Sequence, residues 1–148
     1  MNAYSFFKYF HSGLRFVVVL LVLLAIIQAF LGLLGKKSYS DGNRKLNLFA
    51  MISVHTQLLI GIVLYFLSPF VQFTSETMKD ASTRYWTVEH VSMMVIAIVL
   101  ITIGHSRSKK AILPETKHKA IAIFYTLAFL IVLVAIIQSH RPLFGISA

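Results

Sequence analysis

The stretch FVVVLLVLLAIIQAFLGLL, residues 16–34, decides the fold class of this chain. It contains no charged side chain, and only Gln28 and Gly32 interrupt its apolar character. A run of about 20 apolar residues is long enough to cross the hydrocarbon core of a bilayer as a helix. Because backbone amides in lipid must find partners within the protein, a helix is the structure that such a run predicts.

Three further apolar stretches follow the first, each separated from the next by a polar connector. The chain of 148 residues is 57% hydrophobic and only 13% charged, whereas a soluble domain carries about 25% charged residues. The sequence therefore predicts an all-α integral membrane protein, a four-helix bundle in which residues 1–148 form a single transmembrane domain. The predicted transmembrane segments are residues 6–34, 46–70, 86–105 and 118–140.

The distribution of basic residues predicts how the bundle lies in the membrane. The net charge is +9, but the basic residues gather at segment ends, which favours contact with anionic membrane lipid over binding of nucleic acid. The first and third connectors together hold nine basic residues, and the opposite side holds five. Because positively charged connectors tend to stay in the cytoplasm, we expect a multi-pass protein whose termini both face outward.

Six histidines are many for so apolar a chain, and polar side chains inside a bilayer are candidates for function. The third segment carries His90 and His105, which lie about 22 Å apart along a helix but only about 60° apart around its axis. Antiparallel neighbours joined by a connector bring residues equidistant from the turn to similar depth. This arithmetic pairs His11 with His90 toward the outside and His55 with His105 toward the cytoplasm.

Two neutral imidazoles from facing helices are the usual axial ligands of a b-type haem. We therefore interpret the four paired histidines as iron ligands of haem b, in two layers. The absence of cysteine excludes thiolate ligation and covalent c-type haem attachment. Ala97 and Gly104 lie on the same face as His90, where small side chains would leave room for a flat macrocycle. The candidate partners of haem propionates are Arg15, Arg84 and Arg141 near the outer pair and Arg107 near the inner pair.

Each histidine also has a purely structural interpretation. His118 and His140 lie at helix ends, where histidine is more often an interfacial polar residue than a ligand. His11 and His90 could hydrogen-bond across the helices without a metal. His105 could be a C-terminal helix residue that the helix dipole favours.

Three blocks carry a resemblance to known proteins: Lys8–Arg15 (KYFHSGLR), Val54–Gly61 (VHTQLLIG) and Glu89–His90. They resemble small four-helix bacterial membrane proteins of the cytochrome b-like type and, more distantly, four-helix membrane proteins of the CopD and HemJ types. The resemblance implies haem b bound between helices and electron exchange with quinone or with a partner membrane complex. Carried over residue by residue, it implies the four paired histidines as haem ligands.

Together, these observations predict a b-type cytochrome of a bacterial inner membrane, with periplasmic termini and two haems. It would transfer electrons between a quinone pool and a partner redox protein, as a homodimer or a respiratory-complex subunit more than as a stand-alone enzyme. One alternative is a HemJ-like protoporphyrinogen oxidase with a single haem. Others are a copper-handling protein, which Met93 and Met94 near His90 favour, and a cofactor-free accessory subunit whose histidines only join helices.

Overall fold

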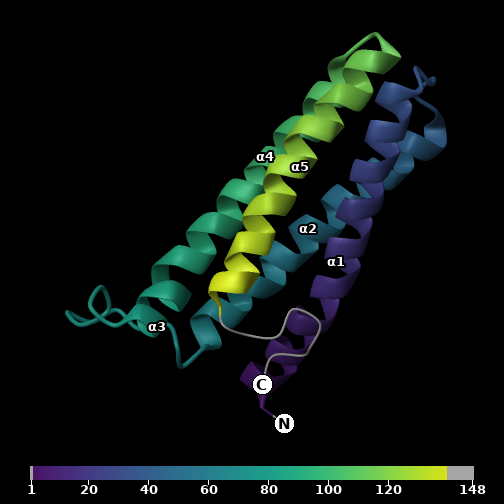
Figure 1. The fold of residues 1–148 in the computed structure, drawn as a ribbon. Coiled ribbons are helices and arrows are strands. Elements are labelled where there is room, and N and C mark those ends of the chain that lie inside the picture. The colour runs from purple at the N-terminus through teal and green to yellow at the C-terminus, as the bar shows by residue number, and fades with distance from the viewer. Residues whose placement is uncertain (1, 140–148) are drawn as a thin grey trace.

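Four long helices form a bundle in the computed structural model of the protein, which describes residues 2–139 (Figure 1). All four are long and apolar enough to cross a membrane, which confirms the predicted all-α four-helix bundle. A short helix and a π-helical turn lead into the third long helix without a break. The elements are α1 (Ala3–Leu34), α2 (Asp41–Leu67), α3 (Ala81–Arg84), the π-helical turn η1 (Tyr85–Glu89), α4 (His90–Lys110) and α5 (Pro114–Gln138).

The start of α2 differs from the predicted segment 46–70 because a cap extends the helix toward its N-terminus. Ser40 Oγ accepts a hydrogen bond from the Asn43 backbone N–H at 3.1 Å, and Asn43 Oδ1 accepts one from the Ser40 backbone N–H at 2.7 Å. This reciprocal pair satisfies two backbone donors that a helix start leaves without partners. The helix then ends at Leu67, directly before Ser68 and Pro69, because a residue preceding proline is driven out of helical geometry.

The connector between α4 and α5 is shorter than the sequence suggested. Helix α4 continues to Lys110, five residues past the predicted end of the third segment. Its basic residues lie in the last turn, where the helix dipole favours them. Helix α5 begins at Pro114, whereas the fourth predicted segment begins at residue 118. Proline is well suited to a first helical turn, since its missing N–H would have no partner there in any case. Only residues 111–113 remain as a connector.

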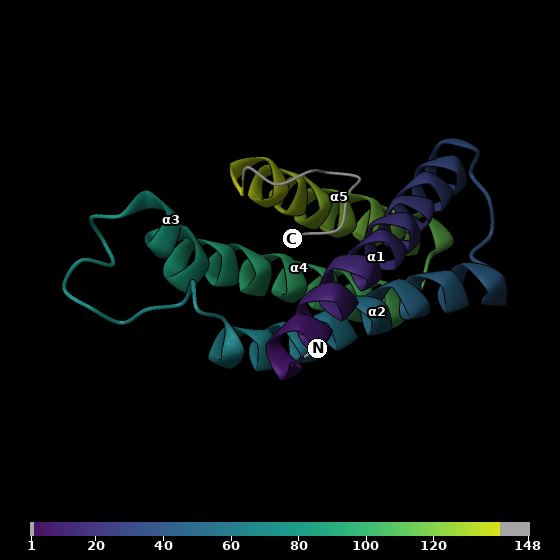
Figure 2. The same cartoon turned by 90° about the horizontal axis from the view of Figure 1, so that it is seen from below.

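The helices pack as a ring in which α1 contacts α2 and α5, and α4 contacts α5 and α2. Figure 2 shows α4 lying between α5 and α2, with α1 crossing beside α2. The two short connectors, residues 35–40 and 111–113, lie at one end of the bundle, which we call the closed end. The start of α1 and the long connector of residues 68–80 lie at the other, which we call the open end.

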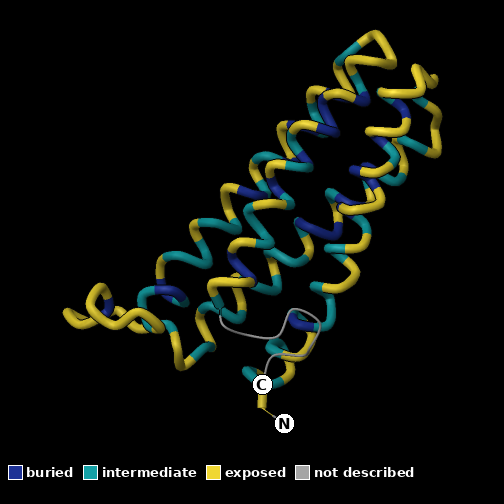
Figure 3. Tube along the Cα trace, in the orientation of Figure 1, coloured by how far each residue is buried: buried dark blue, intermediate teal, exposed yellow. Residues whose placement is uncertain are grey.

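The close-packed core occupies the middle of the bundle and the half toward the closed end. Figure 3 shows most of the buried positions there, on the facing sides of the helices. Alanine occupies six of the twelve core positions, and small side chains let helix backbones approach closely in a membrane bundle. The core residues are Val22, Ala25, Ile26, Ala29, Ala50, Val54, Ala97, Ile101, Ile121, Ala122, Tyr125 and Ala128.

Candidate functional site

The half of the bundle toward the open end contains a cavity of about 330 Å³ between the four long helices. This volume falls at the lower end of the range of small-molecule sites, which are mostly apolar with a few placed polar groups. The apolar walls include Val54, Met94, Ala97, Ile98 and Phe129. The polar residues that line the cavity include Lys8, His11, Arg15, Gln57 and His90.

His11 of α1 and His90 of α4 lie side by side in this cavity. Their ring centroids are 6.5 Å apart, and the ring planes make an angle of 80°. An imidazole nitrogen binds a transition metal at about 2 Å, so two imidazoles on opposite sides of one iron have their centroids roughly 6 Å apart. The structure therefore brings the two rings of the predicted outer pair close together.

The position of His11 is fixed by α2. Gln57 Nε2 donates a hydrogen bond to the His11 carbonyl oxygen at 2.8 Å and so ties the two helices together at this level. Gly61 faces the imidazole, and a Cβ atom there would lie 3.3 Å from His11 Cε1. His11 Nδ1 is itself buried and has no hydrogen-bond partner among residues 2–139. Buried ring nitrogens without a partner are rare, and such a group indicates a role beyond packing.

The position of His90 depends on the π-helical turn that precedes it. The His90 backbone N–H bonds to the Tyr85 carbonyl oxygen, five residues earlier. The Tyr85 hydroxyl donates a hydrogen bond to the Ala135 carbonyl oxygen of α5 and lies 3.4 Å from His90 Nδ1. The Trp86 ring packs against the imidazole, with centroids 5.3 Å apart. Single π-helical turns within α-helices are frequent at functional sites.

Two further segments hold the π-helical turn in place through Thr87, which is buried. The Tyr65 hydroxyl of α2 donates to the Thr87 carbonyl oxygen at 2.7 Å. The Gln72 backbone N–H of the long connector donates to Thr87 Oγ1 at 3.0 Å. The turn that precedes His90 is thus attached to α2, to α5 and to the connector.

The predicted arginines take different places. Arg15 lines the cavity one helical turn after His11. The Arg84 Nε–H donates to Glu89 Oε1 at 2.7 Å, and Arg84 does not line the cavity. Arg107 lies at the closed end, with its guanidinium 5.2 Å from the centroid of the Phe124 ring. Arg141 and His140 lie outside the described residues.

Lys8 is a cavity residue that the sequence analysis missed. It lies three residues before His11, and residues three apart share a helix face, so the spacing was a usable signal. Its ammonium group lies 4.9 Å from the centroid of the Tyr9 ring and 5.5 Å from that of the Tyr4 ring. With Arg15, Lys8 gives the cavity a second cation on α1.

The inner pair is arranged differently from the outer pair. His55 Nε2 lies 2.9 Å from Thr102 Oγ1, and this hydroxyl donates its own proton to the Ile98 carbonyl oxygen. The imidazole of His55 is thus already bonded across α2 and α4. His105 Nδ1 is buried without a hydrogen-bond partner among residues 2–139.

The small residues predicted to leave room for a macrocycle also differ from each other. Ala97 lines the cavity, as a ligand site would require. The space beside Gly104 is filled by Phe124, because a Cβ atom at Gly104 would lie 2.5 Å from Phe124 Cβ. Close packing therefore accounts for Gly104 without a cofactor.

His118 is a packing residue between α5 and α1. It is buried, with 2% of its surface exposed, and three atoms of its ring would lie within 2.6 Å of a Cβ atom placed on Gly32. Its Nε2 lies 3.2 Å from the Ser38 carbonyl oxygen, and the Tyr39 ring packs against it. The sequence favoured an interfacial position for this side chain, whereas the structure shows it buried against a glycine.

Within residues 2–139, no three side chains of histidine, aspartate or glutamate come together as a metal site. A zinc centre uses three or four protein ligands, whereas a haem iron takes only two from the protein. Comparisons of the chain with models of known protein families, with curated proteins and with solved structures found no match.

Proposed function

We propose that this protein is a b-type cytochrome in which His11 and His90 bind one haem b inside the cavity of the open end. The observation that carries the proposal is the 6.5 Å separation of the two imidazole rings across this cavity. Interhelical bonding alone would bring one ring nitrogen onto a partner, yet His11 Nδ1 is buried without one. A haem iron would supply one-electron exchange at this site.

The rest of the cavity suits an amphipathic macrocycle. Apolar side chains such as Val54, Met94 and Phe129 line the walls and would exclude water from a porphyrin face. Lys8 and Arg15 would hold the two propionates, because cations that donate several hydrogen bonds are the natural partners of carboxylates. The chain thus offers two ligands, an apolar slot and two cations within one cavity.

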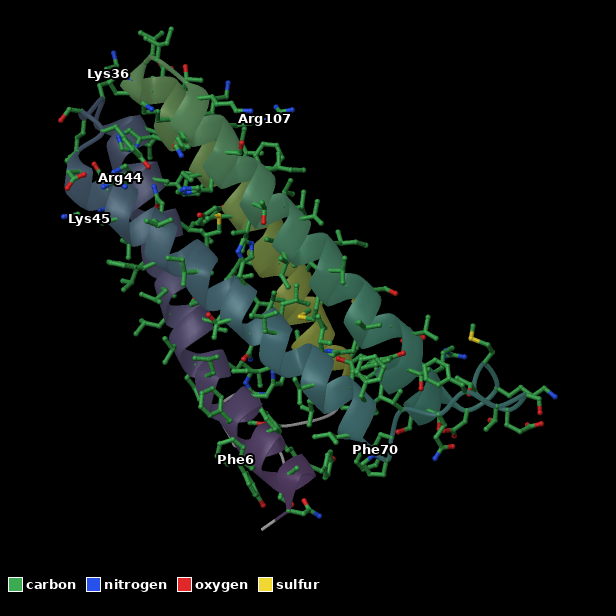
Figure 4. The ribbon with its side chains drawn as sticks, turned by 180° about the vertical axis from the view of Figure 1, so that it is seen from behind. Phe6, Lys36, Arg44, Lys45, Phe70 and Arg107 are labelled. Atoms are coloured by element: carbon green, nitrogen blue, oxygen red, sulfur yellow. The ribbon has the colours of Figure 1, made fainter. Side chains whose placement is uncertain are left out.

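The distribution of charge supports a role at the periplasmic side of a bacterial inner membrane. Figure 4 shows Lys36, Arg44, Lys45 and Arg107 at the closed end, whereas Phe6 and Phe70 lie toward the open end. Basic residues favour the cytoplasmic side, and exposed aromatic residues favour the interface. The haem would then lie in the outer half of the membrane, where it would exchange electrons with a quinone pool and with a partner redox protein.

We further propose that the protein works as a homodimer or as a subunit of a respiratory complex. A second haem at His55 and His105 stays a prediction, and it would require His55 to release Thr102. A HemJ-like protoporphyrinogen oxidase shares the single haem of this proposal. Oxidation of a porphyrinogen by the purified protein would identify that alternative.

Haem content per chain tests the proposal. The protein would be expressed with a supply of haem, purified in detergent, and measured by pyridine haemochrome and by a reduced-minus-oxidised spectrum. We expect one haem b per chain, lost in His11→Ala and in His90→Ala because each substitution removes an axial ligand.

The matched controls are His55→Ala and His118→Ala, which remove a buried or half-buried imidazole away from the cavity. Both should keep the haem. A wild-type protein without haem, prepared beside a cytochrome that loads normally, would contradict the proposal. Equal loss of haem in His55→Ala and His90→Ala would contradict the assignment of His11 and His90 as the haem ligands.

A further inference from the structure

Tyr85 lies where it touches both α5 and the imidazole of His90. Only 6% of its surface is exposed, and its ring packs on Trp86 with centroids 4.7 Å apart. Its hydroxyl donates to the Ala135 carbonyl oxygen, and the same oxygen atom lies 3.4 Å from His90 Nδ1.

Counting protons shows which atom is the donor in the contact between the Tyr85 hydroxyl and His90 Nδ1. A tyrosine hydroxyl has one proton to donate and lone pairs to accept with. The Ala135 carbonyl oxygen can only accept, so it takes the proton of Tyr85. The hydroxyl oxygen can then only accept from His90, which requires a proton on Nδ1. A neutral imidazole with its proton on Nδ1 has its lone pair on Nε2.

The π-helical turn is what makes this contact possible. In an α-helix, residues five apart lie about 140° apart around the axis, so their side chains point to different sides. Hydrogen bonds from residue i to i+5 widen the turn and bring residue i+5 back toward the side of residue i. The segment from Tyr85 to Glu89 has this geometry, and the next residue is His90. The extra residue in the turn therefore places the hydroxyl beside the ring nitrogen.

We propose that Tyr85 is a positioning residue that holds His90 as the Nδ1–H tautomer and so presents Nε2 as the metal-binding nitrogen. The role as a haem ligand rests on the function proposed above, whereas the tautomer is a property of the chain itself. An acceptor on the second ring nitrogen fixes the orientation of a ligating histidine and raises its basicity. A more basic ligand stabilises ferric over ferrous iron, which lowers the reduction potential.

The matched pair of variants for the test is Tyr85→Phe and Tyr65→Phe. Both remove one tyrosine hydroxyl that bonds to a backbone carbonyl at the same end of the bundle, but only that of Tyr85 contacts His90. The first readout is the ¹⁵N NMR shift of the His90 ring nitrogens in the haem-free protein. The second is the affinity and midpoint potential of the haem-loaded protein.

We expect the Nδ1–H tautomer at His90 in the wild type and in Tyr65→Phe, and a mixture with the Nε2–H tautomer in Tyr85→Phe. Haem should bind about 10-fold more weakly in Tyr85→Phe, because loss of the hydrogen-bond partner of a metal-binding histidine typically weakens binding about 10- to 100-fold. Its midpoint potential should be higher than that of the wild type.

An Nε2–H tautomer in the wild type would overturn the assignment without any variant. A midpoint potential that shifts equally in Tyr65→Phe and Tyr85→Phe would also overturn it, because both variants lose a structural bond. If the tautomer is Nδ1–H and sensitive to Tyr85→Phe but no haem binds, the positioning role stands and the cytochrome proposal fails. The two proposals can therefore be separated.

Discussion

The two halves of the bundle each place a histidine ring against a glycine of a neighbouring helix, with different results. Near the closed end, the ring of His118 fills the space beside Gly32 so tightly that a methyl group would lie 2.4–2.6 Å from it. At the open end, the ring of His11 approaches Gly61 more loosely, and a methyl group there would lie 3.3 Å away. His118 has a partner in the Ser38 carbonyl oxygen, whereas His11 Nδ1 has none among the described residues.

This comparison teaches that the surroundings of an imidazole, namely its hydrogen-bond partners and the space beside it, distinguish a packing histidine from a candidate ligand. The closed half gives the His118 imidazole a hydrogen-bond partner and sets it tightly against Gly32, beside a smaller cavity of about 190 Å³. The open half holds two imidazoles across a cavity and fixes their backbones by Gln57 and by the π-helical turn. Such pre-organisation around an apolar space is typical of a ligand site.

Deleting side-chain volume should distinguish the two halves most strongly. Ile121 has no exposed surface, so Ile121→Ala should lower the free energy of unfolding by about 2–5 kcal/mol through lost contacts and a new cavity. Met94 already borders empty space, so Met94→Ala should cost roughly 1 kcal/mol or less. Both values can be measured by denaturant titration in detergent micelles. Equal losses would contradict the contrast between a packed and a hollow half.

Adding one methyl group at each glycine should give the next largest difference. Gly32→Ala places a Cβ against three ring atoms of the buried His118, and such overpacking costs about 1–3 kcal/mol. Gly61→Ala meets only the edge of the His11 ring, so its stability should change little. Gly61→Ala should instead shift the Soret band of the haem-loaded protein, because the added methyl group displaces the His11 ring. A Soret shift in Gly32→Ala but not in Gly61→Ala would reverse the assignment of the two halves.

The smallest expected effect is the pH dependence of amide-proton exchange at Thr83, just after the connector that leads to His90. Hydrogen bonds from the Thr83 hydroxyl and backbone N–H hold the pKa of the Asp80 carboxyl below its ordinary value. A lowered carboxyl pKa contributes stability above the unfolded pKa of about 3.9, and this contribution is lost as the pH falls through the folded pKa. Exchange of the Thr83 amide proton should therefore be protected at neutral pH and lose protection only below about pH 4. In Asp80→Asn the protection should no longer depend on pH in this range.

The four helices could be predicted from the sequence because length and apolar composition alone decide whether a segment spans a bilayer. The juxtaposition of His11 and His90 followed from counting residues away from the connectors, since antiparallel helices convert sequence distance into depth. The same count placed His55 and His105 at similar depth but could not give the rotation of each helix about its axis. That rotation turns His55 toward Thr102.

The π-helical turn could not be predicted from the residues that form it. Tyr85 and Trp86 lie at the end of an apolar segment, where aromatic residues indicate the membrane interface and not a π-helical turn. The extra residue in the turn is held by partners distant in sequence, namely Ala135 for Tyr85, and Tyr65 and Gln72 for Thr87. Such tertiary contacts leave no local pattern in the sequence, so the positioning of His90 emerged only from the structure.

Low-temperature electron paramagnetic resonance of the ferric, haem-loaded protein tests the central claim most directly. The rings of His11 and His90 lie at 80° to each other, and near-perpendicular axial imidazoles give a strongly anisotropic low-spin signal, whereas near-parallel ones give a rhombic signal. The account predicts the strongly anisotropic low-spin signal in the wild type and its loss in His90→Ala. A high-spin signal in the wild type, or a low-spin signal that persists in both His11→Ala and His90→Ala, would contradict it.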